Sequence, residues 1–311
     1  MQPQIFVIGS FIMGLTIKVE RLPVSGETLT GRGFHKDIGG KGFNQALAAS
    51  RAGGNVKLMM CIGKDDFGKA AKEMMQKEEI AADHVFELEN ESTGCGFVSL
   101  LESGDNAIII DAAANNKLNA QMVRSAKDSI SKSTIVMAQL EVPDEPVEEA
   151  FILGREFGCL NILNPAPARR LSLNILKNTD ILTPNETEAK IILGHSPHEN
   201  ISIEKIAEQL LKTGVKTIVM TLGKEGALII TSKETKRIPA PTVKAIDSTG
   251  CGDCFNGNLA KALSENKTLG EAVTLAVHAG SYSAQYLGVS KGLPNAEQLH
   301  QFMNQFQNSK S

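Results

Sequence analysis

The sequence is poor in aromatic residues and in long apolar runs. Its 311 residues include no tryptophan and two tyrosines. No stretch approaches the roughly 20 apolar residues that a membrane span requires, and the N-terminus lacks the basic start and apolar run of a signal peptide. A formal net charge of −3 provides no general basic field for nucleic acid or an anionic membrane. We therefore expect a cytoplasmic protein that binds neither nucleic acid nor a membrane.

The five cysteines are odd in number and scattered, unlike the disulfide framework of a small secreted protein. Cys251 and Cys254 form a C-x-x-C pair, a spacing also found in redox sites. Such redox motifs sit early in a small thioredoxin-like unit, and a zinc site would need a second ligand pair. We expect structural or incidental cysteines.

Short apolar runs alternate with helical patterns along most of the chain. One helical pattern places Ile203, Ile206 and Leu210 at spacings of three and four. Alternating strands and helices predict an α/β fold, with a mostly parallel sheet covered by helices on both faces. No repeat or linker divides the chain, so we expect a single domain over 1–311. The predicted strands lie at 5–8, 56–62, 134–140, 160–163, 180–182, 217–221 and 227–231.

Two regions, at about 14–37 and 94–111, break this alternation with β-rich runs. The second has turn residues at 102–106 between two such runs and predicts a hairpin. We expect a small extra β-sheet inserted at these places. Such a sheet could be a lid, a dimer contact or a decoration of the surface.

The run DSTGCGD at 247–253 follows a strand-like segment at 242–246 and precedes an amphipathic helical pattern. Gly250, Cys251 and Gly252 would then lie at a helix N-terminus, where free N–H groups favour an anion. Asp253 would lie in the first turn, placed to take a proton from a hydroxyl that attacks phosphorus. The alternative is an aspartate that merely caps the helix.

The run GGKGFN at 39–44 is a second glycine cluster. It fails the P-loop spacing, because His35 stands where the first glycine should be. The opening loop at 9–14 also fails the dinucleotide-binding pattern. Lys41 and Asn44 are donors suited to polyhydroxylated or anionic ligands, although a tight turn with a solvated lysine would explain the run equally well.

The run NETE at 185–188 follows a strand-like segment and opens a helix. Carboxylates at i and i+2 do not share a helix face, so we expect Glu186 and Glu188 to act differently. One could hold water around Mg²⁺, or both could belong to a negatively charged, capped first turn. The turn at 221–226 could wrap a nucleotide or simply join two strands.

Taken in order, these motifs resemble the ribokinase family of sugar kinases, the phosphofructokinase-B type, over essentially the whole chain. The resemblance implies a ribokinase-like α/β fold with a small β-sheet lid, and an ATP-dependent carbohydrate kinase. The motifs are GS at 9–10, PVSGET at 23–28, GGKGFNQA at 39–46, QLE at 139–141, NPAPA at 164–168, NETE at 185–188, TLG at 221–223 and DSTGCGD at 247–253.

The resemblance also implies roles for individual residues. Asp253 would deprotonate the primary hydroxyl of the sugar, and the backbone of Gly250, Cys251 and Gly252 would form the anion hole for the γ-phosphate. The lid would cover the sugar and be shared in a homodimer. The implied sugar contacts are Gly39, Gly40, Lys41, Asn44 and Glu141. The implied contacts to ATP are Asn185, Glu188, Thr221, Gly223 and Gly226, with Glu188 holding Mg²⁺ through water. The implied ligands of an activating monovalent cation, usually K⁺, are Asp247 and Thr249.

The first loop departs from the ribokinase pattern. Ribokinases resemble one another in carrying Asn and Asp where this chain has Ile12 and Gly14, and those groups grip sugar hydroxyls. A deoxy sugar, or a sugar with an apolar edge, would suit Ile12 and Met13. Alternatively, Glu141, Asp111 or Asn115 supplies the missing acceptor and a pentose still binds. The run GVSKG at 288–292 also differs from the usual Lys-Gly-Ala run near the cation.

Two other functions fit the same fold. A nucleoside kinase would need a shelf for the base, which Phe11, Phe43 or Phe97 could provide. A sugar-binding regulator without catalysis would tolerate the altered first loop, but it would have no need of Asp253 as a base.

Overall fold

The computed structural model describes residues 3–101, 103 and 105–307. Within these residues the larger sheet has nine strands in the order β13-β12-β11-β10-β9-β8-β1-β4-β5. The consecutive strands β11-β10-β9-β8-β1-β4-β5 are parallel to one another. Strands β12 and β13 are antiparallel to their neighbours. The predicted mostly parallel sheet is confirmed. Its strands are β1 (Gln4–Ile8), β4 (Asn55–Gly63), β5 (Ala81–Leu88), β8 (Ser133–Ala138), β9 (Leu160–Leu163), β10 (Ile181–Leu182), β11 (Thr217–Thr221), β12 (Ala227–Ile230) and β13 (Thr235–Ile238).

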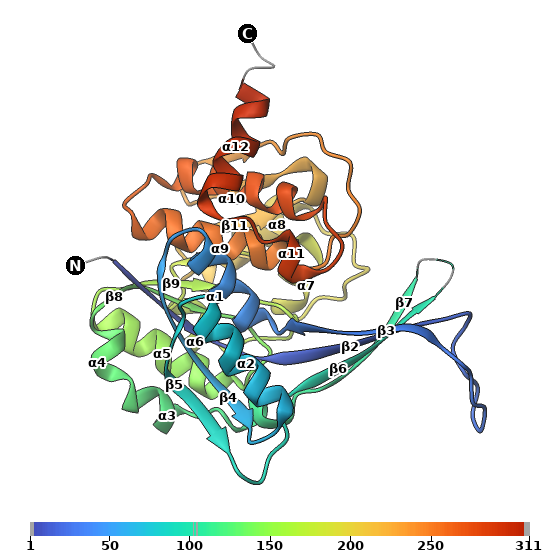
Figure 1. The fold of residues 1–311 in the computed structure, drawn as a ribbon. Coiled ribbons are helices and arrows are strands. Elements are labelled where there is room, and N and C mark those ends of the chain that lie inside the picture. Colours follow the sequence, from blue (N-terminus) through green and yellow to red (C-terminus); the bar gives the residue numbers. More distant parts are fainter. Residues whose placement is uncertain (1–2, 102, 104, 308–311) are drawn as a thin grey trace.

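Helices cover both faces of this sheet (Figure 1). Alternate side chains of β1 enter two separate hydrophobic cores, Ile5 and Val7 one core and Phe6 and Ile8 the other. Helices on the Ile5 side are α1 (Lys41–Arg51), α2 (Asp66–Lys77), α9 (Cys251–Ser264), α10 (Leu269–Ser283), α11 (Val289–Gly292) and α12 (Ala296–Gln307). Helices on the Phe6 side are α3 (Ala120–Ser125), α4 (Lys127–Ile130), α5 (Asp144–Glu156), α6 (Leu173–Lys177), α7 (Glu186–Ile192) and α8 (Ile203–Lys212).

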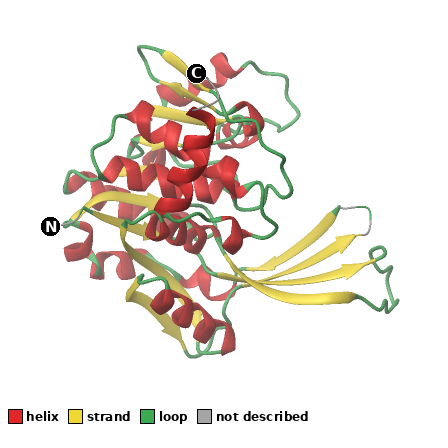
Figure 2. Ribbon diagram, turned by 45° about the horizontal axis from the view of Figure 1, so that its top comes forward, coloured by secondary structure: helices red, strands yellow, loops and turns green. Residues whose placement is uncertain are grey.

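A second sheet, which we call the small sheet, projects from the body of the molecule (Figure 2). Its order in the described residues is β3-β2-β6-β7, as expected for strands inserted into the main alternation. The predicted turn at 102–106 lies partly outside the described residues. The strands are β2 (Ile12–Val19), β3 (Arg32–Gly39), β6 (Cys95–Leu101) and β7 (Asn106–Asp111).

The sequence patterns miss two strands and predict one that does not form. Strands β5 and β13 occupy the two edges of the large sheet, and their mixed polar and apolar residues resemble loop composition. The predicted strand at 242–246 is wrong, since this segment is a loop whose Ile246 N–H donates to the Ala284 carbonyl. It pairs with none of the described strands.

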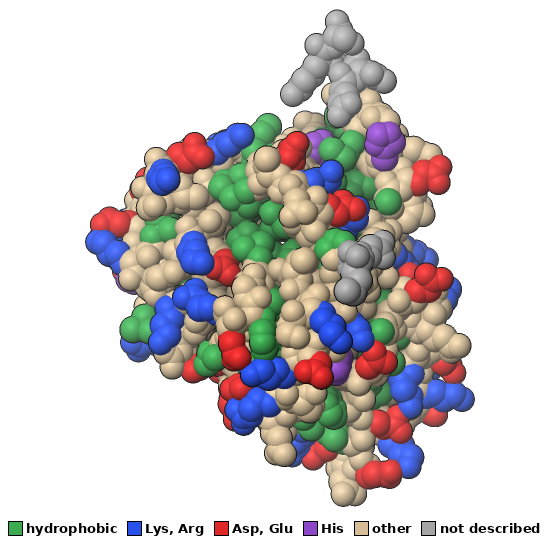
Figure 3. Space-filling view, turned by 90° about the vertical axis from the view of Figure 1, so that its left-hand side faces the viewer, with side chains coloured by type: hydrophobic (Ala, Val, Ile, Leu, Met, Phe, Trp, Pro, Cys, Tyr) green, Lys and Arg blue, Asp and Glu red, His purple; other side chains and the backbone are tan. Residues whose placement is uncertain are grey.

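The surface carries both signs of charge. Acidic and basic side chains are interspersed around apolar patches on the face shown in Figure 3. Among the described residues, no helix is long and apolar enough to cross a membrane.

The large sheet brings distant segments together at the carboxyl ends of its parallel strands. Parallel strands β1, β8, β9, β10 and β11 all end there, as do the loops that enter α1 and α9. From β1 the chain continues to β4 on one side, while β8 lies on the other, so the strand order reverses between β1 and β8. Ligands of open α/β sheets bind at such a reversal, beyond the carboxyl ends of the strands.

Candidate active site

Glu141 and Ser10 meet at the point where the strand order reverses. Ser10 follows β1 and donates from its hydroxyl to Glu141 Oε2 at 2.5 Å. Glu141 follows β8, and the same oxygen accepts the Lys41 backbone N–H at 2.7 Å. The N-cap residue of α1 is Gly40, which has no side chain to cap the helix. Glu141 therefore caps α1 from a distant strand and fixes Lys41 at the site.

Asp253 lies in the first turn of α9, is 5 % exposed, and is held by two neighbouring residues of α1. Asn44 Nδ2 donates to Asp253 Oδ2 at 2.9 Å. Gln45 Nε2 donates to Asp253 Oδ1 at 3.0 Å. Both carboxylate oxygens accept from neutral amides, which leaves the carboxylate able to accept a proton. A carboxylate held in this way is a candidate general base.

Charged side chains from four segments converge on this point. Burial acts to lower the pKa of Lys41, but the negative charges of Asp253, Glu141 and Glu188 outweigh it and leave the pKa raised. Burial raises the pKa of Glu141 and of Glu188, and the charge of Asp253 adds to this while Lys41 opposes it. Three carboxyl groups surround one ammonium group, so the site suits a ligand that brings additional cationic charge.

The N-terminus of α9 offers a cradle for an anion. Gly250 is its N-cap, with φ of 78°, and a Cβ there would lie 2.7 Å from Val289 Cγ1. In the described part of the chain, the N–H groups of Gly252 and Asp253 meet no acceptor, and a Cβ on Gly252 would meet nothing within 4 Å. The Cys251 N–H donates to the Ser248 carbonyl at 3.2 Å. Free donors and open space therefore lie beside Asp253, while the Cys251 N–H is already engaged.

Asn185 and Glu188 form a capping box at the start of α7. Asn185 Oδ1 accepts the Glu188 N–H and Glu188 Oε2 accepts the Asn185 N–H, each at 2.8 Å. Glu186 is exposed, whereas Glu188 lies toward Lys41 and Asp253, so the two carboxylates differ as expected. Asn185 also forms a parallel bridge with Thr221. The cap accounts for one oxygen of Glu188 and leaves the other available.

The turn after β11 places two predicted nucleotide contacts at the same edge. Gly223 has φ of 55° and Gly226 has φ of 96°, values that glycine adopts without strain. A Cβ on Gly226 would collide with the Ile238 carbonyl. Thr221, Gly223 and Gly226 therefore belong to a tight turn next to Asn185, in which Gly223 is exposed and Gly226 is buried.

Asp247 ties together two loops near the start of α9. Its Oδ1 accepts the Thr249 N–H at 2.9 Å and its Oδ2 accepts the Gly288 N–H at 3.0 Å. Burial acts to raise the pKa of Asp247, but these hydrogen bonds outweigh it and lower the pKa. The Thr249 side chain also bonds this carboxylate, and a carboxylate with a lowered pKa stays ionised and attracts a cation. Among the described residues, however, no cluster of three His, Cys, Asp or Glu could hold a metal by itself.

A pocket of about 600 Å³ opens beside Glu141 and Ile12. Of two other residues that could replace the missing sugar acceptor, Asn115 is occupied, whereas Asp111 is exposed and outside the pocket lining. Asn115 is fully buried and bonds the Phe11 N–H, the Phe11 carbonyl and the Ala112 carbonyl. Asp111 accepts the Ala113 N–H at 3.0 Å. Of the three proposed acceptors, Glu141 alone lines the pocket.

Several residues of the site carry no signal in the sequence. Arg169 forms one wall of the pocket, where it bonds Asp144 Oδ1 and the Leu140 and Val142 carbonyls. Asn116 and Ile110 also line the pocket. Their contribution depends on chain segments that only the fold brings together.

The thiols do not form a redox site. All five cysteines are free, and Cys254 is fully buried with its thiol donating to the Ala279 carbonyl at 3.3 Å. Burial raises the pKa of Cys251 and of Cys254. A raised pKa keeps a thiol protonated and unreactive, contrary to what a C-x-x-C redox motif requires.

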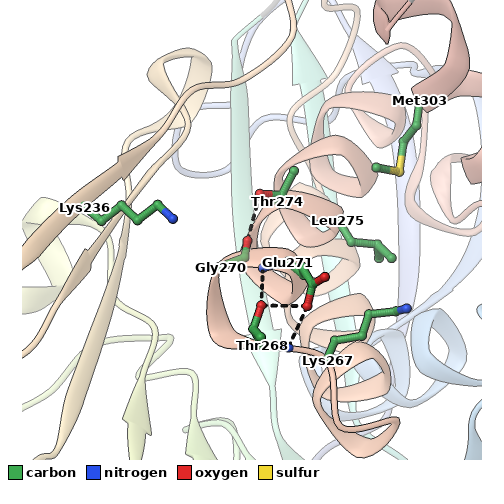
Figure 4. Close-up of a pocket in the computed structure, with 8 residues that line it drawn as sticks. All are labelled: Lys236, Lys267, Thr268, Gly270, Glu271, Thr274, Leu275 and Met303. Carbon is green, nitrogen blue, oxygen red and sulfur yellow. Dashed lines mark hydrogen bonds between the residues drawn. The ribbon is translucent and has the colours of Figure 1, made fainter.

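A second pocket, of about 450 Å³, lies between β13 and the start of α10 (Figure 4). Figure 4 shows Lys236 extending from β13 toward Gly270 and the capping box of Thr268 and Glu271. The far end of α10 contacts the start of α9, because a Cβ on Gly280 would lie 3.3 Å from the Cys251 carbonyl. Ten helical residues span about 15 Å, so this pocket lies away from Asp253 and is separate from the active site.

Comparison with known proteins places this geometry in a family. The model of the "pfkB family carbohydrate kinase" matches residues 2–296. The chain belongs to the PfkB family of carbohydrate kinases. It is 35% identical to the ribokinase of Haemophilus influenzae over 97% of this chain and 99% of the relative. It is 31% identical to the deoxyribokinase of Salmonella typhi over 96% of this chain and 98% of the relative.

A solved PfkB relative has the same fold. The structure of Arabidopsis thaliana ribokinase complexed with ribose and ATP matches with a TM-score of 0.91 and 28% identity, over 97% of this chain and 99% of that one. The expected ribokinase-like fold is confirmed, and the PfkB chain is an ATP-dependent carbohydrate kinase. The regulator without catalysis is thereby set aside. Relatives named for ribose and for deoxyribose are both present, so similarity alone does not identify the sugar.

Proposed function

We propose that the chain transfers the γ-phosphoryl group of ATP to the primary hydroxyl of a small sugar, with Asp253 as the general base. The hydroxyl oxygen attacks the γ-phosphorus as its proton passes to the Asp253 carboxylate, and the bond from phosphorus to the β,γ-bridging oxygen breaks to release ADP. The observation that supports this most directly is the position of Asp253, which is buried, held by two amides and beside the free N–H groups of α9. The free N–H groups of Gly252 and Asp253, in the turn that Gly250–Gly252 forms, would stabilise charge on the transferring group.

ATP would bind along the turn at 221–226 and the start of α7. Asn185, Thr221, Gly223 and Gly226 offer backbone and amide groups there, and the free oxygen of Glu188 would hold Mg²⁺ through water. Mg²⁺ usually keeps several waters and takes its remaining ligands from one or two carboxylates and the substrate phosphates. Without a metal, the excess of carboxyl groups around Lys41 would repel the phosphates of ATP. This supports a metal that arrives with ATP.

The sugar would contact Gly39, Gly40, Lys41 and Asn44. These four residues do not line the pocket, but Glu141 adjoins both places, since it lines the pocket and accepts the Lys41 N–H. Ile12 forms part of the wall and provides no acceptor. With Asn115 engaged elsewhere and Asp111 outside the pocket lining, a hydroxyl facing Ile12 would lose its partner at a cost of about 0.5–1.5 kcal/mol. This favours a pentose that lacks one hydroxyl, such as 2-deoxyribose, over ribose.

Asp247 and Thr249 would bind the activating monovalent cation. The loop at 288–292 reaches this point through the hydrogen bond from Gly288 to Asp247. Turnover in KCl, compared with tetramethylammonium chloride at equal ionic strength, tests the assignment. Equal rates in the two salts would rule out activation by K⁺.

We also propose that two copies associate through the small sheet, which would act as a lid over the sugar. Large apolar side chains are exposed on it: Phe34, Phe97, Ile108, Ile109 and Ile110. Exposed apolar patches on soluble proteins commonly mark interfaces. If this is correct, light scattering on the purified protein would give twice the mass of one chain. The variant Ile109→Lys would then give the mass of a single chain.

The experiment that tests the reaction is ADP release with Mg-ATP and K⁺ across ribose, 2-deoxyribose, other pentoses, hexoses and nucleosides. Asp253→Asn should abolish turnover of the preferred sugar. Asp66→Asn is a matched control, because Asp66 is an exposed carboxylate in the first turn of α2, away from the site. Full activity of Asp253→Asn would refute the role of Asp253 as a base.

The structure gives little support to a nucleoside as the substrate. Phe11 and Phe43 are fully buried in contact with each other, with ring centroids 5.2 Å apart. Phe97 pairs with Ile109, while its neighbour Gly96 pairs with Ile110, which lines the pocket. Because successive side chains alternate between the faces of a sheet, Phe97 points away from the pocket. None of the three can serve as a shelf for the base in this arrangement.

A further inference from the structure

The side chain of Gln45 joins Asp253 to a buried glutamine that does not touch it. Gln45 Nε2 donates to Asp253 Oδ1 and to Asn164 Oδ1, each at 3.0 Å. Gln45 Oε1 accepts from Gln139 Nε2 at 2.7 Å. Gln45 and Gln139 are fully buried and Asn164 is 6 % exposed. These amides come from α1 and from the ends of β8 and β9, so the link crosses the sheet edge beneath the base.

In this series of linked side chains, the chemistry of the groups determines which one donates and which one accepts each hydrogen bond. An ionised carboxylate only accepts hydrogen bonds, so Gln45 must present its NH₂ group to Asp253. Its oxygen then faces Gln139, which must present its own NH₂ group in turn. As a result, Gln139 Oε1 is buried without a hydrogen-bond partner in the described part of the chain. An orphaned buried acceptor is costly and calls for an explanation.

Close packing holds both glutamines in place. A Cβ on Gly9 would lie 2.3 Å from Gln139 Oε1, so only glycine leaves room for this side chain after β1. A Cβ on Gly257 would lie 2.5 Å from the Gln45 carbonyl, so α9 and α1 are in close contact one turn after Asp253. The Gln139 amide is therefore confined by Gly9, and the backbone of Gln45 is confined by α9.

We propose that Gln139 and Gln45 are positioning residues for the general base, with Gln139 orienting Gln45 and Gln45 fixing the Asp253 carboxylate. This inference rests on the proposed function of Asp253. The two donors to Asp253 then divide the work. Asn44 can turn its amide to the bound sugar and free Oδ2 for the hydroxyl proton, while Gln45 stays on Oδ1 throughout.

Other charged or ionisable groups also act on Asp253, and the test must distinguish their effect from that of the two glutamines. Lys41 on α1, Glu141 after β8 and Glu188 on α7 carry charge toward it, and the thiols of Cys251 and Cys254 lie on its own helix. Gln45 and Gln139 are uncharged at every pH. A change in the pH profile on replacing them would therefore arise from the hydrogen bonds and from none of these charges.

The test uses Gln45→Met, Gln139→Met and the double variant, since methionine keeps the length of glutamine and removes its amide. Turnover of ribose and 2-deoxyribose is measured against pH. We expect Gln45→Met to lower kcat by about 10–100-fold, less than the roughly 10²–10⁴-fold of a whole general-base contribution because Asp253 itself remains, with little change in KM for ATP. The acid limb of the profile should move to higher pH, because the ionised form of the base loses a donor.

The double variant separates positioning from simple stability. If Gln139 acts only through Gln45, the double variant should lose no more activity than Gln45→Met alone, whereas independent sites would add. Asn161→Leu is the matched control. Asn161 is a fully buried amide with an unpartnered oxygen, and it bonds the Phe151 and Asn178 carbonyls away from the site. It should change the melting temperature and leave the pH profile unchanged.

Each outcome has one interpretation. Full activity of Asp253→Asn would overturn both the role of Asp253 as a base and the positioning role of Gln45 and Gln139. If Asp253→Asn is inactive but Gln45→Met keeps its kcat and pH profile, only the positioning role of the two glutamines is overturned. Additive losses in the double variant, with Asp253→Asn inactive, would lead to the same conclusion. A crystal structure of Gln45→Met gives a test independent of substrate. We expect the Asp253 carboxylate to leave its position beside Asn44, and an unmoved carboxylate would contradict the proposal.

Discussion

Asn44 Nδ2 donates to Asp253 Oδ2 at 2.9 Å, although the two residues are 209 positions apart in the chain. The bond joins the first turn of α1 to the first turn of α9. It places a glycine-rich loop suited to a polyhydroxylated ligand directly against a candidate base. The two motifs that stand out in the sequence therefore form one site.

Replacing Asn44 tests this contact. Asn44→Leu keeps the size of the side chain and removes the donor, so kcat/KM for the sugar should fall by about 10–100-fold, since a hydrogen bond to a charged group contributes about 1.5–3 kcal/mol. Asn174→Leu is the control, because Asn174 Nδ2 also donates to a carboxylate, Glu148, at 2.9 Å, but at an exposed position. Equal kcat/KM in the two variants would contradict the prediction.

The anion cradle predicts opposite effects on stability and on activity. Gly252→Ala should stabilise α9 by up to about 1 kcal/mol, because alanine is the better helix former. The new methyl group would enter the space beside the free N–H groups, so turnover should fall at least about tenfold. Steady-state kinetics and thermal melting measure both effects.

Gly270→Ala is the control for this prediction. Gly270 occupies the same second position in α10, and the neighbour of a Cβ there would be the flexible end of Lys236 at 3.4 Å. We expect equal or higher stability with normal turnover. Normal turnover in Gly252→Ala as well would show that the γ-phosphate lies elsewhere.

Glu188 should trade stability for function. Burial raises its pKa above the ordinary value of 4.5, so the folded state holds a proton that the unfolded state has lost. Stability therefore falls as pH rises above 4.5, and it stays lower at neutral pH. Glu188→Gln keeps the capping box and removes the charge. At pH 7 its Tm should rise by about 1–2 °C, the effect of roughly 1 kcal/mol in a chain of this length, while turnover with Mg-ATP falls.

Differential scanning fluorimetry from pH 4 to pH 8 checks the sign. The advantage of Glu188→Gln should shrink toward the acid end, where the wild-type carboxyl group is protonated. A variant that melts lower than the wild-type protein at pH 7 would mean that the charge of Glu188 is stabilising.

The thiols should be inert at neutral pH. Burial raises the pKa of Cys61 to about 12 and also raises those of Cys95 and Cys159. Cys251 and Cys254 behave alike, so iodoacetamide at pH 7.5 should leave activity nearly unchanged over an hour. Cys251→Ser should also retain activity, because the proposed cradle uses its backbone. Rapid inactivation that Cys251→Ser prevents would identify a reactive thiol instead.

Ile12 should control the choice between two pentoses. Ile12→Asn restores a polar group to the pocket wall, so the ratio of kcat/KM for ribose to that for 2-deoxyribose should rise by about tenfold or more, as a matched hydrogen bond permits. Ile152→Asn is the control, because Ile152 is exposed on α5. An unchanged ratio would place the second hydroxyl away from Ile12.

Sequence patterns predict the fold best where strands are buried on both faces. Central strands such as β1 and β4 are nearly continuous apolar runs, which is why their positions agree with the prediction. The edge strands β5 and β13 mix polar and apolar residues because one side is open to solvent, and the same ambiguity produced the false strand at 242–246. Edge structure depends on which neighbour is present, and local sequence does not encode that.

The sequence alone determined the α/β class, the small inserted sheet and the residues with unusual local chemistry, such as Asp253 and the glycines before it. These follow from periodicity, turn residues and motif order, which are properties of short segments. Only the tertiary structure decided that Asn115 is unavailable to a sugar and that Glu141 caps α1. It also revealed Gln45 and Gln139 behind the base. Buried amides acquire a role from the partner to which they donate, and here that partner lies up to 208 positions away.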